Sequence, residues 1–144
     1  MSSDEDLLER VRERARMNNY WRHMGVEALA AEAGYARLRV PIRDELRNAD
    51  GAPVHGGVLS FLVDAAIGGA LATLHEQAAG GVGQATLDLN IRFLGAARGE
   101  AIIAEGRILR RGGTIAFGEA ELRDESGDLV AKGSATYMIL RPRV

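Results

Sequence analysis

The sequence contains no cysteine, which excludes a disulfide scaffold, a thiolate zinc site and a cysteine nucleophile. It has only three histidines, His23, His55 and His75, and their wide spacing gives no reason to expect a metal site. The formal net charge is −2, so the composition carries no basic footprint for nucleic acid or for an anionic membrane. The chain begins with acidic and polar residues, unlike a signal peptide, and we therefore expect a cytoplasmic protein.

At 144 residues, the chain has room for one domain with a sizeable core, but not for two. We expect residues 1–23 to form a helical extension and residues 24–141 to form the core. An apolar run over residues 56–74 is long enough to span a bilayer. Asp64 lies at its centre, where a charge is costly in lipid, so we interpret the run as a buried helix of a protein without a membrane anchor.

Hydrophobic periodicity predicts the remaining elements. An amphipathic helix is expected near the start, ending at about Asn18, and the buried helix is expected from Gly57 to Glu76. Residues 26–33 favour a strand, although their alanines make a helix a fair competitor. Alternating apolar and polar residues predict further strands, separated by short turns, over residues 36–42, 86–93, 100–109, 114–123 and 129–140.

Short turns favour antiparallel pairing, because parallel strands need long crossovers. A helix that is apolar on nearly every side must be wrapped by a curved sheet, and the small residues along this helix allow the sheet to approach closely. The sequence therefore predicts an α+β protein with one antiparallel sheet around one central helix. The edge strands and outer face of such a sheet make dimer formation natural.

The head of the central helix has features of an oxyanion-binding site. Gly56 and Gly57 allow a ligand to approach their backbone N–H groups, and a helix start favours negative charge. His55 precedes them and is expected to shape the loop. Asp64 is predicted to be a buried carboxylate, which usually has either a partner such as an arginine or a chemical function. Poor solvation suits a general base near neutral pH, whereas direct carboxylate attack is the alternative.

The spacing of these residues limits how they can cooperate. Gly56 and Asp64 are separated by eight helical residues, which rise about 12 Å at about 1.5 Å each. One substrate carbonyl therefore cannot contact both groups of the same chain. If both act on one substrate, the motif predicts a symmetric homodimer with two composite sites.

The order His-Gly-Gly followed by an apolar helix with an acid nine residues after the histidine resembles the hot-dog-fold thioesterases, in particular the PaaI-type branch. Residues 86–94 also resemble the strand that follows the helix in that family. The resemblance covers roughly residues 24–140. It implies a hot-dog fold, a dimer that is often a dimer of dimers, and hydrolysis of acyl-CoA without a metal or cofactor, coenzyme A being part of the substrate.

The same resemblance implies the site residues. The Gly56 N–H would polarise the thioester carbonyl, Asp64 of the partner subunit would activate water, Thr86 would stand beside this acid, and His55 would support the loop. The family commonly has an asparagine six residues before the histidine, whereas here Asn48 lies seven before it and is the candidate for that place. A related branch carries a hydroxyl four residues after the acid, where this chain has a glycine.

Substrate-binding candidates are Gly57, whose backbone N–H a ligand can approach, and Arg92, Arg110 and Arg111, because guanidinium groups suit the phosphates of coenzyme A. The simpler interpretation of Arg110 and Arg111 is that they are solvated turn residues. His75, near the helix end, is expected to complement the helix dipole. Two other functions on the same fold stay open: an acyl-thioester hydratase or dehydratase, which needs a histidine paired with an acid, and a non-catalytic acyl-CoA-binding protein.

Overall fold

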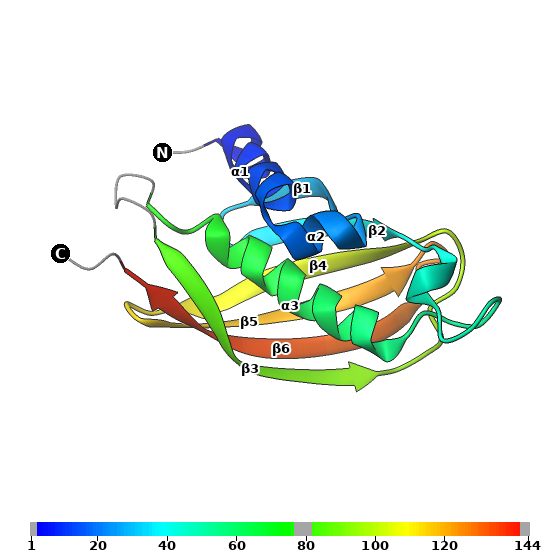
Figure 1. The fold of residues 1–144 in the computed structure, drawn as a ribbon. Coiled ribbons are helices and arrows are strands. Elements are labelled where there is room, and N and C mark those ends of the chain that lie inside the picture. The colour runs from blue at the N-terminus through cyan, green and yellow to red at the C-terminus, as the bar shows by residue number, and fades with distance from the viewer. Residues whose placement is uncertain (1–2, 77–81, 142–144) are drawn as a thin grey trace.

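A computed structural model describes residues 3–76 and 82–141 of the chain (Figure 1). One long helix lies along one face of a six-stranded sheet, and two shorter helices cover the same face beside it. No helix among the described residues is both long and apolar enough to cross a membrane. In chain order the elements are α1 (Asp4–Met17), α2 (Asn19–Met24), β1 (Glu27–Glu32), β2 (Tyr35–Pro41), η1 (Asp44–Leu46), α3 (Gly56–Ala72), β3 (Gly83–Phe93), β4 (Ala101–Arg111), β5 (Ile115–Asp124) and β6 (Leu129–Leu140).

The strands lie in the order β1-β2-β4-β5-β6-β3, and every neighbouring pair is antiparallel. This arrangement confirms the predicted α+β hot-dog architecture. Residues 26–33 contain the strand β1 and not the competing helix. This strand pairs antiparallel with β2, whose residues alternate between the core and the more exposed face of the sheet. The strand β3 follows α3 in sequence but lies at the far edge of the sheet, next to β6.

The central helix packs unusually close to the sheet because both surfaces carry small residues. On β4, a Cβ added to Gly106 would lie 2.2 Å from the main-chain oxygen of Ala66 in α3. On β5, a Cβ at Gly118 would lie 2.6 Å from the Ile67 side chain. Glycines in the facing strands therefore permit the close approach of the helix, which the sequence analysis had attributed to the small residues of the helix alone.

The N-terminal region contains two helices where the sequence predicted one. Ser3 and Asp6 form a capping box at the start of α1, and its apolar face buries Leu7 and Val11 in the core. Asn18 ends α1 and also caps α2, because its Oδ1 accepts hydrogen bonds from two backbone N–H groups. The second helix, α2, lies at the end of the expected helical extension, and its six residues are too few to show a period in the sequence.

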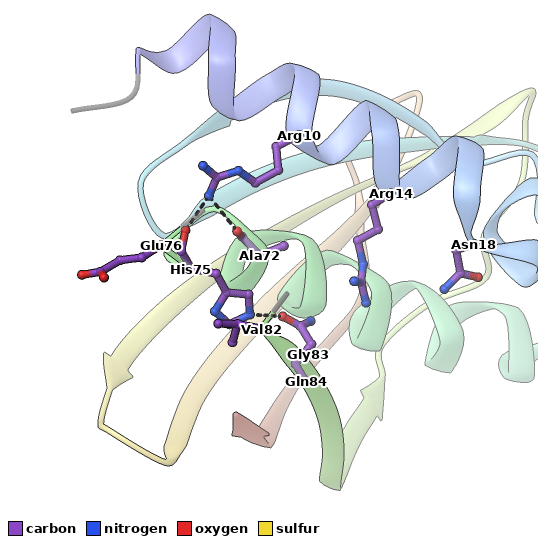
Figure 2. Close-up of a pocket in the computed structure, with 9 residues that line it drawn as sticks. All are labelled: Arg10, Arg14, Asn18, Ala72, His75, Glu76, Val82, Gly83 and Gln84. Atoms are coloured by element: carbon purple, nitrogen blue, oxygen red, sulfur yellow. Dashed lines mark hydrogen bonds between the residues drawn. The ribbon is translucent and has the colours of Figure 1, made fainter. Parts of the chain in front are cut away.

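The end of α3 differs from prediction in two ways. The helix ends at Ala72 and not at Glu76, since the Thr73 hydroxyl donates to the Ala70 carbonyl and accepts the N–H of Gly34. The cation at this end is Arg10, which donates to the carbonyls of Ala72, Thr73 and His75 at 2.9–3.2 Å (Figure 2). His75 does not serve as the dipole partner: burial and the nearby Arg111 lower its pKa, which favours the neutral ring.

The edge strand β3 exposes an apolar surface. Leu87 and Phe93 are 55% and 57% exposed, and Leu89 also faces solvent. A register shift between Thr86 and Asp88 interrupts the simple alternation that the sequence suggested. A long edge strand with apolar side chains and unpaired backbone groups is suited to pairing with another chain.

Candidate active site

Asp64 lies in the third turn of α3, where its carboxylate meets two hydroxyl groups from the sheet. Thr86 of β3 donates to Asp64 Oδ1 at 2.8 Å. Tyr137 of β6 donates to the same oxygen, and its hydroxyl is 2.8 Å from the main-chain oxygen of Asp64. Asp64 is half-buried, which corrects the expectation of a fully buried carboxylate: it opens into a cavity while its helical neighbours Val63 and Ala65 face the core. No described residue forms an ion pair with it.

Tyr137 is a site residue that the sequence did not reveal. It lies directly opposite Thr86 in the β3–β6 register, so both hydroxyls reach Asp64 from the same face of the sheet. Burial and the adjacent Asp64 raise the pKa of the Tyr137 phenol, which keeps the hydroxyl protonated and able to donate. The sequence does contain one indication of this function, a tyrosine on the otherwise apolar inward face of β6. A buried phenol needs a hydrogen-bond partner.

Gly68 stands one turn after Asp64, at the position where a related branch of the family carries a hydroxyl residue, and its surroundings leave no room for a side chain. A Cβ at this position would lie 3.0 Å from the Tyr137 hydroxyl and 3.2 Å from Gln84 Nε2. The space of a serine or threonine side chain is therefore filled by groups from β3 and β6. Tyr137 supplies the hydroxyl that the helix lacks.

The start of α3 offers one backbone N–H for a ligand. His55 is the N-cap, and its Nδ1 accepts the N–H of Gly57 at 2.8 Å, so that donor is occupied. The Gly56 N–H has no hydrogen-bond acceptor among the described residues. The Phe93 ring packs on Gly56, with 3.2 Å between its Cε1 and the position of an added Cβ. His55 therefore occupies the Gly57 N–H and leaves the Gly56 N–H as the donor without an acceptor among the described residues at this helix end.

The two halves of the motif are separate within one chain. Gly56 and Asp64 both belong to the uninterrupted helix α3, so about 12 Å of helix rise lies between them. Gly56 lies beside Phe93 at one end of β3, whereas Asp64 lies beside Thr86 near the other end. Within one chain, the acid and the helix N-terminus are therefore too far apart to contact one carbonyl group.

Two cavities lie beneath the N-terminal helices, and one of them is lined by Asp64. One, of about 480 Å³, is lined by Asp64 with Thr86, Tyr137 and aromatic residues of α2 and α3. The other, of about 670 Å³, lies between α1, the end of α3 and the start of β3 (Figure 2). Arg14 lines both cavities, although no pattern in the sequence predicts that it lies near Asp64. Burial lowers the pKa of Arg14, while Tyr137 and Asp64 oppose that effect.

The proposed substrate-binding residues do not gather at one place. Asn48 is exposed in a loop where its N–H donates to the Pro53 carbonyl, and no contact among the described residues joins its side chain to Gly56 or Asp64. Arg92 lies far along β3 from Gly83, which lines the second cavity. The nine residues between them span about 30 Å at about 3.3 Å per residue.

Arg110 and Arg111 lie at the opposite end of the sheet from Arg92, where β4 ends. Arg110 is exposed, and Arg111 donates to the Gly112 carbonyl at 3.2 Å and lies close enough to His75 to lower the pKa of its ring. Within one chain, Arg92 cannot contact the same phosphate as these two residues.

Comparison with known proteins identifies the family. Residues 53–131 match the model of the thioesterase superfamily, a segment that contains His55, Asp64 and Thr86. The chain belongs to this superfamily.

Human acyl-coenzyme A thioesterase 13 is 30% identical over 138 residues, covering 94% of this chain and 95% of that protein. The medium/long-chain acyl-CoA thioesterase YigI of Escherichia coli is 34% identical over 98 residues, covering 60% of this chain and 62% of that protein. The structure of the Escherichia coli PaaI protein aligns with a TM-score of 0.83 over 99% of this chain and 97% of its own, at 16% identity, and so shows a shared fold.

Proposed function

We propose that this protein hydrolyses acyl-CoA thioesters to a free acid and coenzyme A. The observation that carries the proposal is the Asp64 carboxylate, which two hydroxyls hold at the wall of a cavity without an arginine or lysine partner among the described residues. A carboxylate held in this way is suited to orient and deprotonate water. The relatives named as acyl-CoA thioesterases support the same substrate class.

We further propose that each active site is composite and that the functional unit is a homodimer. The exposed apolar edge strand β3 supports pairing of two chains, which would extend the sheet across the dimer. The Gly56 N–H of one chain would then face Asp64 of the partner subunit. A dimer of dimers, as the family resemblance implies, would use the outer face of the sheet.

In the proposed reaction, a water oxygen attacks the thioester carbonyl while Asp64 takes the water proton. The Gly56 N–H, at the positive end of the α3 dipole, stabilises the negative charge that develops on the carbonyl oxygen. The carbon–sulfur bond then breaks, and the proton on Asp64 passes to the leaving thiolate. Attack by Asp64 itself, giving an anhydride that water then hydrolyses, has the same overall balance.

The competing hydratase or dehydratase reaction needs a histidine that moves a proton at carbon together with an acid. His55 Nδ1 accepts the Gly57 N–H, and about 12 Å of helix rise separates its helix end from Asp64 in the same chain. This geometry favours a supporting function for His55. A non-catalytic acyl-CoA-binding protein is tested by the experiment below.

The first test measures thiol release from acetyl-, hexanoyl-, decanoyl-, phenylacetyl- and hydroxybenzoyl-CoA by wild type and Asp64→Asn. Asparagine keeps the size of the side chain and an acceptor for both hydroxyls but cannot accept the water proton. We expect turnover to fall by about 10²-fold or more while the melting temperature changes little. Turnover on no substrate would contradict the proposed function and favour a binding protein, whereas turnover that is indifferent to position 64 would refute the catalytic function of Asp64.

A second test isolates the backbone donor with Gly56→Pro. Proline is tolerated at the first helical position, and His55 already has the extended backbone that precedes proline (φ −61°, ψ 138°). The variant therefore removes the N–H and keeps the helix, with an expected loss of about 10²–10³-fold in kcat. The control Gly56→Ala keeps the N–H and makes the same close contact with Phe93, so equal losses in both variants would refute the oxyanion function.

A third test asks whether the sites are composite by mixing the Gly56→Pro and Asp64→Asn chains after dissociation. If each site combines Gly56 and Asp64 from different chains, half of the dimers are mixed and each mixed dimer has one intact site. Activity should recover to about a quarter of wild type. No recovery, with chain exchange shown by mass-tagged subunits, would place both residues in one chain's site and refute the composite arrangement.

A further inference from the structure

We propose that the space beneath α1 is a subsite for the remote end of the acyl group, and that it selects acyl chains ending in a carboxylate. The inference rests on the proposed function, because it places the thioester carbonyl at Asp64. It assigns a substrate class that neither the motif nor the fold specifies.

The cavity lined by Asp64 and the second cavity meet at three side chains, Arg14, Asn18 and Gln84, which line both of them. An acyl group whose carbonyl is at Asp64 can therefore continue from the first cavity into the second. In Figure 2 the Arg14 side chain descends from α1 toward α3, and Gln84 approaches from β3. The residues at this junction decide what kind of acyl end fits.

Arg14 is fixed in place but has no hydrogen-bond acceptor. Its guanidinium lies over the Trp21 ring, 5.2 Å from the ring centroid. Its buried Nε has no hydrogen-bond partner, and Tyr137 and Asp64 act on its charge without forming an ion pair with it among the described residues. Stacking on an aromatic ring leaves the edge of a guanidinium free, and this rigid fork matches the two oxygens of a carboxylate.

The other two residues at the junction also present donors, because their acceptor atoms are already used. Asn18 Oδ1 accepts the N–H groups of the first turn of α2 at 3.0 Å, which leaves the Asn18 NH₂ group free. Gln84 Oε1 accepts from His75 Nε2 at 2.8 Å, and Gln84 Nε2 donates one hydrogen to the Gly68 carbonyl at 2.9 Å and keeps the other. A ligand at the junction therefore meets only donors from these three side chains.

The charge around the second cavity is positive on its inner side. Arg10, Arg14 and Arg111 each lower the pKa of His75 by electrostatic repulsion. Together they disfavour a further positive charge in this region. The acid that lines this cavity, Glu76, is exposed at its rim. Burial disfavours the charged form of Arg14, and Tyr137 and Asp64 offset this effect only in part, so an anionic acyl end would add a charge-assisted hydrogen bond that further stabilises the guanidinium.

The position of Arg14 indicates the length of the preferred acyl chain. Arg14 Nη2 lies 3.6 Å from the point where a Cβ of Gly68 would be, and Gly68 is one helical turn, about 6 Å, beyond Asp64. Extended chains advance about 1.2 Å per bond. A carboxyl group about five bonds from the thioester carbon therefore fits, as in adipyl-CoA.

The experiment compares kcat/KM for butanoyl-, hexanoyl- and octanoyl-CoA with their ω-carboxy counterparts succinyl-, adipyl- and suberyl-CoA. We expect adipyl-CoA to exceed hexanoyl-CoA in the wild type, and Arg14→Met to reduce the ratio of the two by about 10- to 100-fold. Arg14→Lys keeps the charge without the planar fork and should retain part of the preference. Arg12→Met, on the exposed face of the same helix, is the control and should leave the ratio unchanged.

Three outcomes are distinguishable. If no acyl-CoA thioester of either series is hydrolysed, the proposed thioesterase function is refuted. If the plain esters are hydrolysed but the wild type shows no preference for the ω-carboxy series, the subsite is refuted while the thioesterase function stands, and this holds even if Arg14→Met does not fold. If Arg14→Met raises KM equally for both series, Arg14 binds coenzyme A and not the acyl end, which also refutes the inference.

Discussion

Replacing Tyr137 by phenylalanine tests whether a hydroxyl from β6 positions the Asp64 carboxylate. The phenol is 4% exposed, and its hydroxyl contacts Asp64 both at the carboxylate and at the main-chain oxygen. Phenylalanine fills the same space without the donor. Asp64 would keep only the Thr86 hydroxyl, on the same Oδ1 atom, and its side chain would gain rotational freedom.

The size of the effect follows from the type of bond. A hydrogen bond to a charged group contributes about 1.5–3 kcal/mol, and water reaching the half-buried Asp64 replaces part of it. We expect the free energy of unfolding to fall by about 1–2 kcal/mol, or about 3–6 °C in melting temperature for a chain of this length. Looser positioning of the base should reduce kcat about tenfold, equivalent to about 1.4 kcal/mol in activation free energy, with little change in KM.

The assay measures kcat and KM on the best acyl-CoA substrate together with thermal unfolding. Tyr35→Phe is the matched control, because it removes a hydroxyl that donates to Glu105 on the outer face of the sheet. It should change stability without changing kcat. Because the pKa of Tyr137 is raised, the wild-type donor should also persist to above pH 10, the ordinary value for tyrosine. An unchanged kcat in Tyr137→Phe would refute the positioning function, whatever happens to stability.

Three further predictions concern the scaffold. Gly106→Ala should destabilise the fold by about 3 kcal/mol or more in chemical denaturation, because its Cβ would lie 2.2 Å from the Ala66 oxygen, whereas Gly113→Ala, with nothing within 4 Å, should be neutral. Arg10→Met removes three hydrogen bonds to the carbonyls at the end of α3 and should cost about 1–2 kcal/mol; an unchanged melting temperature would contradict this. Because the pKa of His75 is lowered, its contribution to stability is present above about pH 6.5 and is lost as the pH falls toward the folded-state pKa, so melting temperatures at pH 7.5 and 5 should differ less in His75→Gln than in wild type.

The local pattern of the sequence was enough to predict the central helix, six strands (one of them in competition with a helix) and the antiparallel sheet. Periodicity reports which face of an element is apolar, and turn length reports whether neighbours can be antiparallel. The spacing from Gly56 to Asp64 was equally informative, because a helix converts a residue count into a distance. The family resemblance and the candidate acid both came from this one continuous stretch, and Thr86 lies against Asp64 in the structure as the resemblance implied.

The tertiary structure decided the surroundings of Asp64, since these come from distant parts of the chain. Tyr137 is 73 residues from Asp64, and Arg10 caps the helix end from 62 residues away. Arg14 joins them only because the apolar face of α1 packs against the core beside α3. The alternation of apolar and polar residues indicates which side chains of a strand face inward. Which of these side chains contact one another depends on the strand register and on where the helices pack, and both are determined by the packing of the whole chain.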